Sequence, residues 1–234
     1  MKTHRFITLI IVLVLSSCSE LQQVTNQLPN TPLSNADIAA GLREALNTGI
    51  DKQVSKLTLE DGFLKNELVK IVLPTELQRV DKTLRNIGLG KLADEGLKVL
   101  NRAAEDAVKE ATPIFVNAVK GITFTDAKNI LLGADNAATN YLKTETMTPL
   151  YDKFNPVIEN SFKKVGADII WTNLITKYNG IPLVNKVNPD LTDYTTKEAL
   201  KGVYTMIAIE EKEIRNKISS RTSSLLKKVF ALQD

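Results

Sequence analysis

The chain has 234 residues, a formal net charge of +3, one histidine and one cysteine. His4 lies in a segment that we expect to be removed, which leaves no imidazole for Ser-His-Asp or Cys-His catalysis and no His–Cys set for zinc. No block of five or more basic residues occurs, so we expect no nucleic-acid partner. An enzyme built from this chain would depend on carboxylates, Lys, Tyr or Ser, or on a hard cation held by oxygen atoms. The sequence indicates neither a cofactor nor a metal site.

Residues 1–17 have the pattern of a secretion signal peptide. A short basic start precedes an apolar run from Phe6 to Leu15, which is too short for a membrane-spanning helix of roughly 20 apolar residues. The run ends in Leu15-Ser16-Ser17-Cys18, which resembles the lipobox of bacterial lipoproteins. Loss of Lys2 and Arg5 with the signal would lower the net charge from +3 to +1.

Cys18 is the only cysteine, and exported proteins often avoid a cysteine that is neither paired nor modified. The lipobox resemblance implies cleavage before Cys18, a diacylglyceryl group on its sulfur and a third acyl chain on the new amino terminus. Three chains would hold the protein firmly on a membrane. Ser19 replaces the Asp that retains Gram-negative lipoproteins at the inner membrane. In a Gram-negative source we therefore expect the outer membrane, with the domain facing the periplasm.

Residues 18–33 are predicted to form the lipidated cysteine and a flexible tether. This stretch is rich in Gln, Asn, Thr and Pro and has no sustained period, so it would space the domain from the bilayer. Residues 34–234 suit one domain with a buried core. Helical periods and caps recur along this domain, which predicts an all-α fold, a compact multi-helix bundle behind the tether.

The first half of the domain contains three predicted helices. One spans 34–49 and ends at Gly49, and a second spans 75–87 behind a capping box. The third, 91–111, carries Ala and Leu at spacings of four and three, which predicts close packing against a partner helix. Pro113 is predicted to stop or kink the chain that follows.

The second half is also predicted to be helical. Thr123 with Asp126 forms a predicted capping box, and Asp135 is predicted to cap a helix over 136–147. Prolines at 149 and 156 are expected to punctuate the next segment. The remaining predicted helices are 169–178, 195–217 and a short one at 225–230.

Four segments of the chain carry a family resemblance: 101–105, 126–133, Gly133–Thr139 and 211–215. They resemble a bacterial lipoprotein family that is catalogued as domain-of-unknown-function family 4197. The block Gly133–Thr139 is the most specific, and the resemblance extends over nearly the whole predicted domain. The resemblance implies an all-helical envelope domain, and it implies no enzymatic reaction.

Four polar residues in the middle of the chain are candidate site residues. Asp126 and Asp135 stand at adjoining helix starts, where they would serve as ligands or an acid/base pair, or would only cap the helices. Arg102 and Glu105 share a polar helix face and would form either a charged anchor in a groove or a solvated salt bridge.

The long C-terminal helix supplies further candidates. Glu210 and Glu211 flank its apolar stripe, and Arg215 lies four residues after Glu211. These glutamates are either perturbed functional carboxylates or members of an ion pair at the edge of the core. Thr139 from the Gly133–Thr139 block completes the candidate polar cluster, which serves binding or structure. No catalytic residue is assigned.

Three functions remain open at this point. The first, which we favour, is a non-catalytic interaction or structural module that binds an envelope protein or cell-wall component near the membrane. The second is a carrier or sensor of a small apolar ligand, which requires an enclosed apolar pocket. The third is a carboxylate-based envelope hydrolase, which requires two carboxyl groups roughly 5 to 9.5 Å apart across a cleft. Tyr141 and Tyr151, interpreted mainly as packing residues, are also candidates to line a cleft near the Gly133–Thr139 block.

Overall fold

The computed structural model describes residues 33–86, 88, 90–180, 182–183, 186–188 and 190–234. The predicted signal peptide, Cys18 and residues 19–32 of the predicted tether lie outside the described residues. Contacts divide the chain into two units after Ser34, and the unit from Asn35 to Asp234 contains all of the helices described below.

This unit consists of helices joined by loops. No strand occurs among the residues that the structure describes, which confirms the predicted all-α class. The helices are α3 (Asn35–Leu57), α4 (Thr75–Asn86), α5 (Gly90–Val108), α6 (Ala111–Gly121), α7 (Phe124–Leu131), α8 (Ala137–Lys164), α9 (Ala167–Asn179), α10 (Thr192–Asn216), the 3-10 turn η1 (Ile218–Ser220) and α11 (Ser224–Phe230). Within the described ranges, no helix has the length and hydropathy needed to cross a membrane.

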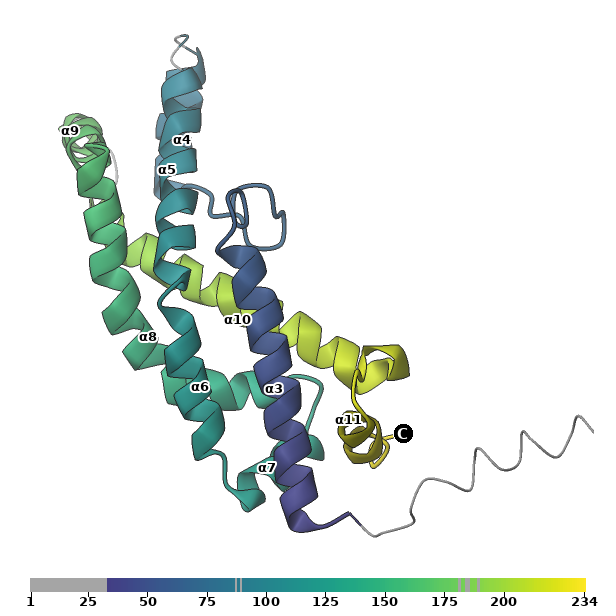
Figure 1. Ribbon diagram of the computed structural model, residues 1–234. Coiled ribbons are helices and arrows are strands. Elements are labelled where there is room, and N and C mark those ends of the chain that lie inside the picture. The colour runs from purple at the N-terminus through teal and green to yellow at the C-terminus, as the bar shows by residue number, and fades with distance from the viewer. Residues whose placement is uncertain (1–32, 87, 89, 181, 184–185, 189) are drawn as a thin grey trace, which may run out of the picture. The chain divides into compact units, whose positions relative to one another are not determined.

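The three longest helices organise the packing. α8 contacts α5, α6 and α10, while α3 contacts α6, α7, α10 and α11. In Figure 1, α10 crosses α3 obliquely, and α11 lies beside the N-terminal half of α3. The close approach of α11 depends on Gly41, where an added Cβ would lie 2.6 Å from a methyl group of Val229.

The alanine-rich stripe of α5 packs as its spacing predicts. Ala93, Leu100, Ala104 and Ala107 are fully buried, and α5 lies against α8. Small side chains let the two helix axes approach, so the helix with the clearest sequence period is also central to the core.

The predicted stop at Gly49 is wrong, because α3 continues through it to Leu57. Gly49 faces α10, where an added Cβ would lie 3.3 Å from the Cγ of Glu210. The glycine therefore provides room for a neighbouring helix, and it does not end its own.

The predicted interruptions at Pro149 and Pro156 are also wrong, because both prolines lie inside α8. An interior proline destabilises a helix by about 3 kcal/mol. Burial of one large apolar side chain contributes about 1.5–3 kcal/mol, and α8 buries several on the face that packs in the core. They are Leu142, Leu150, Phe154, Ile158 and Phe162. Packing therefore outweighs both prolines.

The end of α5 and the start of α10 also differ from prediction. The predicted helix 91–111 ends at Val108, and α6 begins at Ala111. Pro113 falls in the first turn of α6, where a backbone N–H has no partner within the helix, so the proline is tolerated there. α10 begins at Thr192, three residues before the predicted start.

Candidate functional site

The carboxylate of Glu211 caps the N-terminus of α8. Its Oε1 accepts the backbone N–H of Ala138 at 2.9 Å, and its Oε2 accepts both the backbone N–H and the hydroxyl of Thr139 at 2.8 Å. The residue at the N-cap position is Asn136 and not the predicted Asp135, and Asn136 makes no side-chain cap hydrogen bond. A side chain from α10 takes its place and satisfies the first amides of α8.

Arg215 joins Glu211 to the end of α7. Its Nε and Nη2 donate to Oε1 of Glu211 at 3.0 and 2.8 Å, so of the two alternatives for Glu211 the structure contains the ion pair. Its Nη1 and Nη2 also donate to the carbonyl oxygens of Leu131 and Ile130 at 3.0 and 2.8 Å. The cation thus lies at the negative C-terminus of α7 and the anion at the positive N-terminus of α8, which favours both charges.

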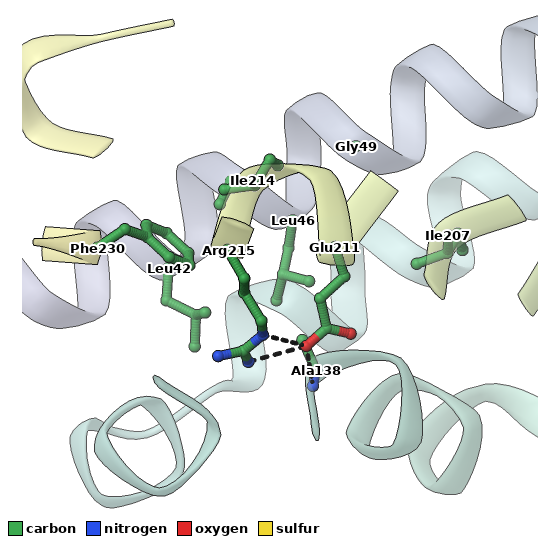
Figure 2. A pocket seen from close by; sticks show the side chains of 10 residues that line it. Leu42, Leu46, Gly49, Ala138, Ile207, Glu211, Ile214, Arg215 and Phe230 are labelled. Atoms are coloured by element: carbon green, nitrogen blue, oxygen red, sulfur yellow. Dashed lines mark hydrogen bonds and ion pairs between the residues drawn. The ribbon is translucent and has the colours of Figure 1, made fainter. Parts of the chain in front are cut away.

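This ion pair is enclosed by apolar side chains. The side chains of Arg215 and Glu211 are 4% and 6% exposed. Figure 2 shows both of them directed from α10 toward Ala138, with the apolar residues of α3, α10 and α11 around them. The cavity in this region has a volume of about 20 Å³, enough for about one water molecule.

Arg102 and Glu105 hold a different part of the chain, the loop between α3 and α4. Glu105 accepts the backbone N–H of Phe63 at 3.1 Å and pairs with Arg102 at 2.5 Å. Arg102 also reaches Asp61 at 2.6 Å and Glu60 at 2.9 Å. Hydrogen bonds from Lys65 and Arg102 keep the pKa of the Asp61 carboxyl below its usual value. The pair therefore fixes a loop.

Asn101 completes this loop anchor, and the sequence assigned it no separate role. Its amide binds both the backbone N–H and the carbonyl of Ile71 at 2.8 Å, and it also donates to the carbonyl of Leu97. Asn101 is fully buried. The only signal in the sequence is an amide residue next to the apolar stripe of α5, which does not reveal a partner 30 residues away.

Glu210 and Asp126 have separate structural contacts. Glu210 accepts hydrogen bonds from Lys52 and Gln53 at 2.6 Å, which ties α10 to α3. Asp126 forms the predicted capping box with Thr123, whose hydroxyl and backbone N–H lower the pKa of the Asp126 carboxyl. Each carboxylate is therefore occupied by groups of the domain itself.

The candidate residues do not form one cluster. The structure brings together Thr139, Glu211 and Arg215 at the α7–α8–α10 junction, and it brings Arg102 and Glu105 together at the loop. Glu210 and Asp126 bind partners outside both groups, and no described hydrogen bond joins Asp135 to either group. Over the described ranges, no group of three or more His, Cys, Asp or Glu residues has an arrangement that would hold a metal ion.

A surface groove follows α10 and is bounded on its other side by α8 and by the loop that precedes α8. Its first hollow, of about 640 Å³, is lined by Thr139, Asn140, Lys143, Met147, Thr148, Tyr151, Lys197, Glu198, Leu200, Lys201, Tyr204, Thr205 and Ala208. A second hollow, of about 800 Å³, is lined by Ala134, Asp135, Asn136, Thr205, Ala208, Ile209 and Lys212. The two hollows share Thr205 and Ala208, and together they are called the α8–α10 groove below.

The groove contains part of the Gly133–Thr139 block and one of the two tyrosines proposed to line a cleft there. Tyr151 lines the first hollow and donates to Asp193 at 2.7 Å, whereas Tyr141 is not among the lining residues. The hydroxyl of Tyr204 is bonded to Thr146 at 2.8 Å, and burial raises the pKa of this tyrosine. The chemistry that the groove offers is mainly apolar contact with lysines at its edges.

Comparison with known proteins gives one match. A family model described as "Protein of unknown function (DUF4197)" matches residues 32–231, nearly all of the helical unit. Neither the curated proteins nor the solved structures contain a match.

Proposed function

The chain belongs to the DUF4197 family, and we propose that its helical domain is a docking module that lipid on Cys18 holds at the bacterial cell envelope. The module binds an envelope protein through the α8–α10 groove. No chemical step is part of this proposal.

The α8–α10 groove is the observation that carries the proposal. The buried charged residues are engaged in holding the domain together, since Glu211 and Arg215 join three helices and Glu105 fixes a loop. The groove, in contrast, presents apolar surface with exposed lysines beside it. An open apolar surface rimmed by polar groups is typical of a protein-binding site.

The two alternative functions have less support. A carrier of a small apolar ligand needs a pocket of roughly 300–1,000 Å³, whereas the enclosed apolar cavity beside Glu211 has about 20 Å³. A hydrolase needs two carboxylates that converge across a cleft. Three of the candidate carboxylates, those of Glu105, Asp126 and Glu211, accept backbone N–H groups at different places in the fold.

The anchor is tested by replacing the cysteine. In cells that produce the chain, Cys18→Ala should move the protein from the membrane fraction to the soluble fraction or leave it as an uncleaved precursor. The N-terminal peptide of the unaltered protein should carry the mass of three acyl chains. Ser17→Ala keeps a small residue before the cysteine and should leave both readouts unchanged. An unlipidated N-terminus that begins elsewhere would refute the anchor.

Docking is tested in the same cells with a short-range chemical crosslinker. The unaltered protein should form a discrete covalent complex with another envelope protein. Ala208→Trp places a large ring where the two hollows meet and should reduce that complex at least about fivefold. Thr144→Trp, at an exposed position of α8 outside the groove lining, is the matched control. Equal yields from all three proteins would refute docking through this groove.

A further inference from the structure

The length of the α8–α10 groove limits what it can bind. Its α10 wall extends from Lys197 to Lys212, a stretch that rises about 22 Å along the helix axis. A bound helix of about four turns has the same length. The groove is therefore long enough for a helical segment.

The floor of the groove is apolar over its central part. Leu200 and Tyr204 are buried beneath it, while Ile209 is 37% exposed at the surface. Met147 on α8 is half-buried, and its flexible thioether can adapt to different apolar partners. A helix that presents apolar side chains at spacings of three and four would cover this floor.

The charged residues around the floor are mostly cationic. Four lysines and two acids line the groove: Lys143, Lys197, Lys201, Lys212, Asp135 and Glu198. Lys197 and Lys201 form exposed ion pairs with acids of their own helix, and such pairs contribute little stability. Lys143 on α8 and Lys212 on α10 have no carboxylate within ion-pair distance among the described residues. Both walls thus present an ammonium group that a partner carboxylate can neutralise.

We infer that the partner segment is an amphipathic helix whose apolar stripe is flanked by Asp and Glu. The apolar stripe would cover the floor, and the acids would meet the lysines of both walls. The inference rests on the proposed docking function and specifies the partner chemistry. A lipid surface fits less well, because a bilayer is flat and would not enter a recess between two helices.

The experiment captures the occupant in intact cells. A benzophenone amino acid replaces Thr205, which lines both hollows, and in a control protein it replaces the exposed Lys98 on α5. After irradiation, the crosslinked peptide is sequenced by mass spectrometry. We expect capture from position 205 of a segment with apolar residues at helical spacing and an excess of Asp and Glu. Position 98 should not capture it.

Charge reversal then tests the role of the lysines. Lys143→Glu combined with Lys212→Glu should lower the yield from position 205 at least about fivefold, since each reversed rim charge weakens association. Lys143→Arg with Lys212→Arg keeps the charges and should retain the yield. Lys98→Glu with Lys153→Glu, at exposed positions outside the groove lining, should also retain it.

The outcomes separate this inference from the proposed function. A captured protein segment that is neutral or basic, or a yield that charge reversal leaves unchanged, overturns the inference while docking stands. A lipid or glycan adduct at position 205 overturns the partner class. Capture of a protein at position 98 and not at position 205 would place the docking surface on another face of the domain. No protein adduct at either position, together with no complex in the chemical crosslinking experiment, overturns both proposals.

Discussion

Two buried glutamates of this protein hold distant backbone segments in place, and they differ in the solvent exposure of the arginines that pair with them. Glu211 and Glu105 both accept backbone N–H groups from distant segments, and each pairs with an arginine on its own helix. Arg215 is 4% exposed and binds two backbone carbonyls, whereas Arg102 is 26% exposed and shares its charge with surface acids. The two carboxylates are equally buried, at 5% and 6% exposed, so the difference lies in the arginines. Because water reaches Arg102 and not Arg215, loss of Arg215 should destabilise the fold more than loss of Arg102.

The largest effect is expected from Arg215→Met. The substitution leaves Glu211 as a buried charge without a cation and removes one donor from each of the carbonyls of Ile130 and Leu131. These carbonyls keep the N–H of Gly133 and the amide of Gln233, respectively. Loss of one partner of a buried pair destabilises a protein by about 3–5 kcal/mol. Urea unfolding followed by circular dichroism measures this change.

The corresponding substitution at the loop, Arg102→Met, sharpens the contrast. Its free energy of unfolding should fall by less than that of Arg215→Met, because Arg102 is already partly exposed to solvent and its hydrogen bonds go to side-chain carboxylates, whereas Arg215 also binds two backbone carbonyls. The Glu211→Leu, Arg215→Met double variant should lose less than the sum of its two single variants, since no unpaired charge remains. Equal losses at Arg102 and Arg215 would contradict the comparison.

The next effect is expected from Asn101→Ala, which removes the amide that holds Ile71. The buried N–H and carbonyl of Ile71 would lose their partner, with a loss of about 1–3 kcal/mol. Hydrogen exchange at the amide of Ile71 should accelerate far more than exchange in α8. The exposed Asn173→Ala should change stability by less than about 0.5 kcal/mol. Uniform acceleration over the whole domain would show that the loop does not open separately.

A smaller effect concerns pH at the loop. The folded-state pKa of Asp61 is lowered by Lys65 and Arg102, so its contribution is present above the unfolded-state pKa of about 3.9. That contribution is lost as pH falls through the lower folded-state pKa. Asp61→Asn should therefore have a lower Tm than the unaltered protein at pH 7, and the difference should shrink toward pH 3. Asn also tolerates the positive φ of 67° at this position.

The matched comparison for this pH effect is Asp51→Asn, at an exposed position of α3. Its Tm difference from the unaltered protein should be small at both pH values. A constant Tm deficit for Asp61→Asn between pH 7 and pH 3 would indicate a turn effect of the side chain and exclude the ion-pair contribution.

The smallest effect on stability is expected at the α8–α10 groove. Lys143→Glu and Lys212→Glu change exposed side chains without an ion-pair partner in the described part of the chain, so unfolding should shift by less than about 0.5 kcal/mol each. The same urea titration measures this. A larger loss would mean that these lysines support the fold, and their effect on partner capture would then have a structural cause.

Local patterns predicted much of the secondary structure. The capping box of Thr123 and Asp126 closes within three residues, and the stripe of α5 repeats every three or four residues, so both could be recognised from neighbours in the chain. The predictions failed at Gly49, Pro149 and Pro156, because the outcome there depends on residues far away in the chain. Their local preference is to break a helix, and the packing of α3 and α8 against distant helices overrides that preference.

The contacts of the buried polar residues also divide into local pairs, which a sequence can indicate, and distant pairs, which it cannot. The pairing of Glu211 with Arg215 follows from a spacing of four on one helix, so the sequence indicated it as one of two alternatives. The cap that Glu211 supplies to Ala138 spans 73 residues, and the link from Asn101 to Ile71 spans 30. The groove likewise requires walls from two helices about fifty residues apart in the chain.

By itself, the sequence determined the helical class, most of the apolar faces, the Thr123–Asp126 capping box and the lipobox pattern at Cys18, because each depends on residues within a few positions of one another. The tertiary structure alone decided which helix ends meet the Glu211–Arg215 pair, which loop Glu105 holds and where α8 and α10 leave apolar surface uncovered. Those outcomes depend on how buried faces pack together, and a side chain's distant partner is set only when the whole core has formed.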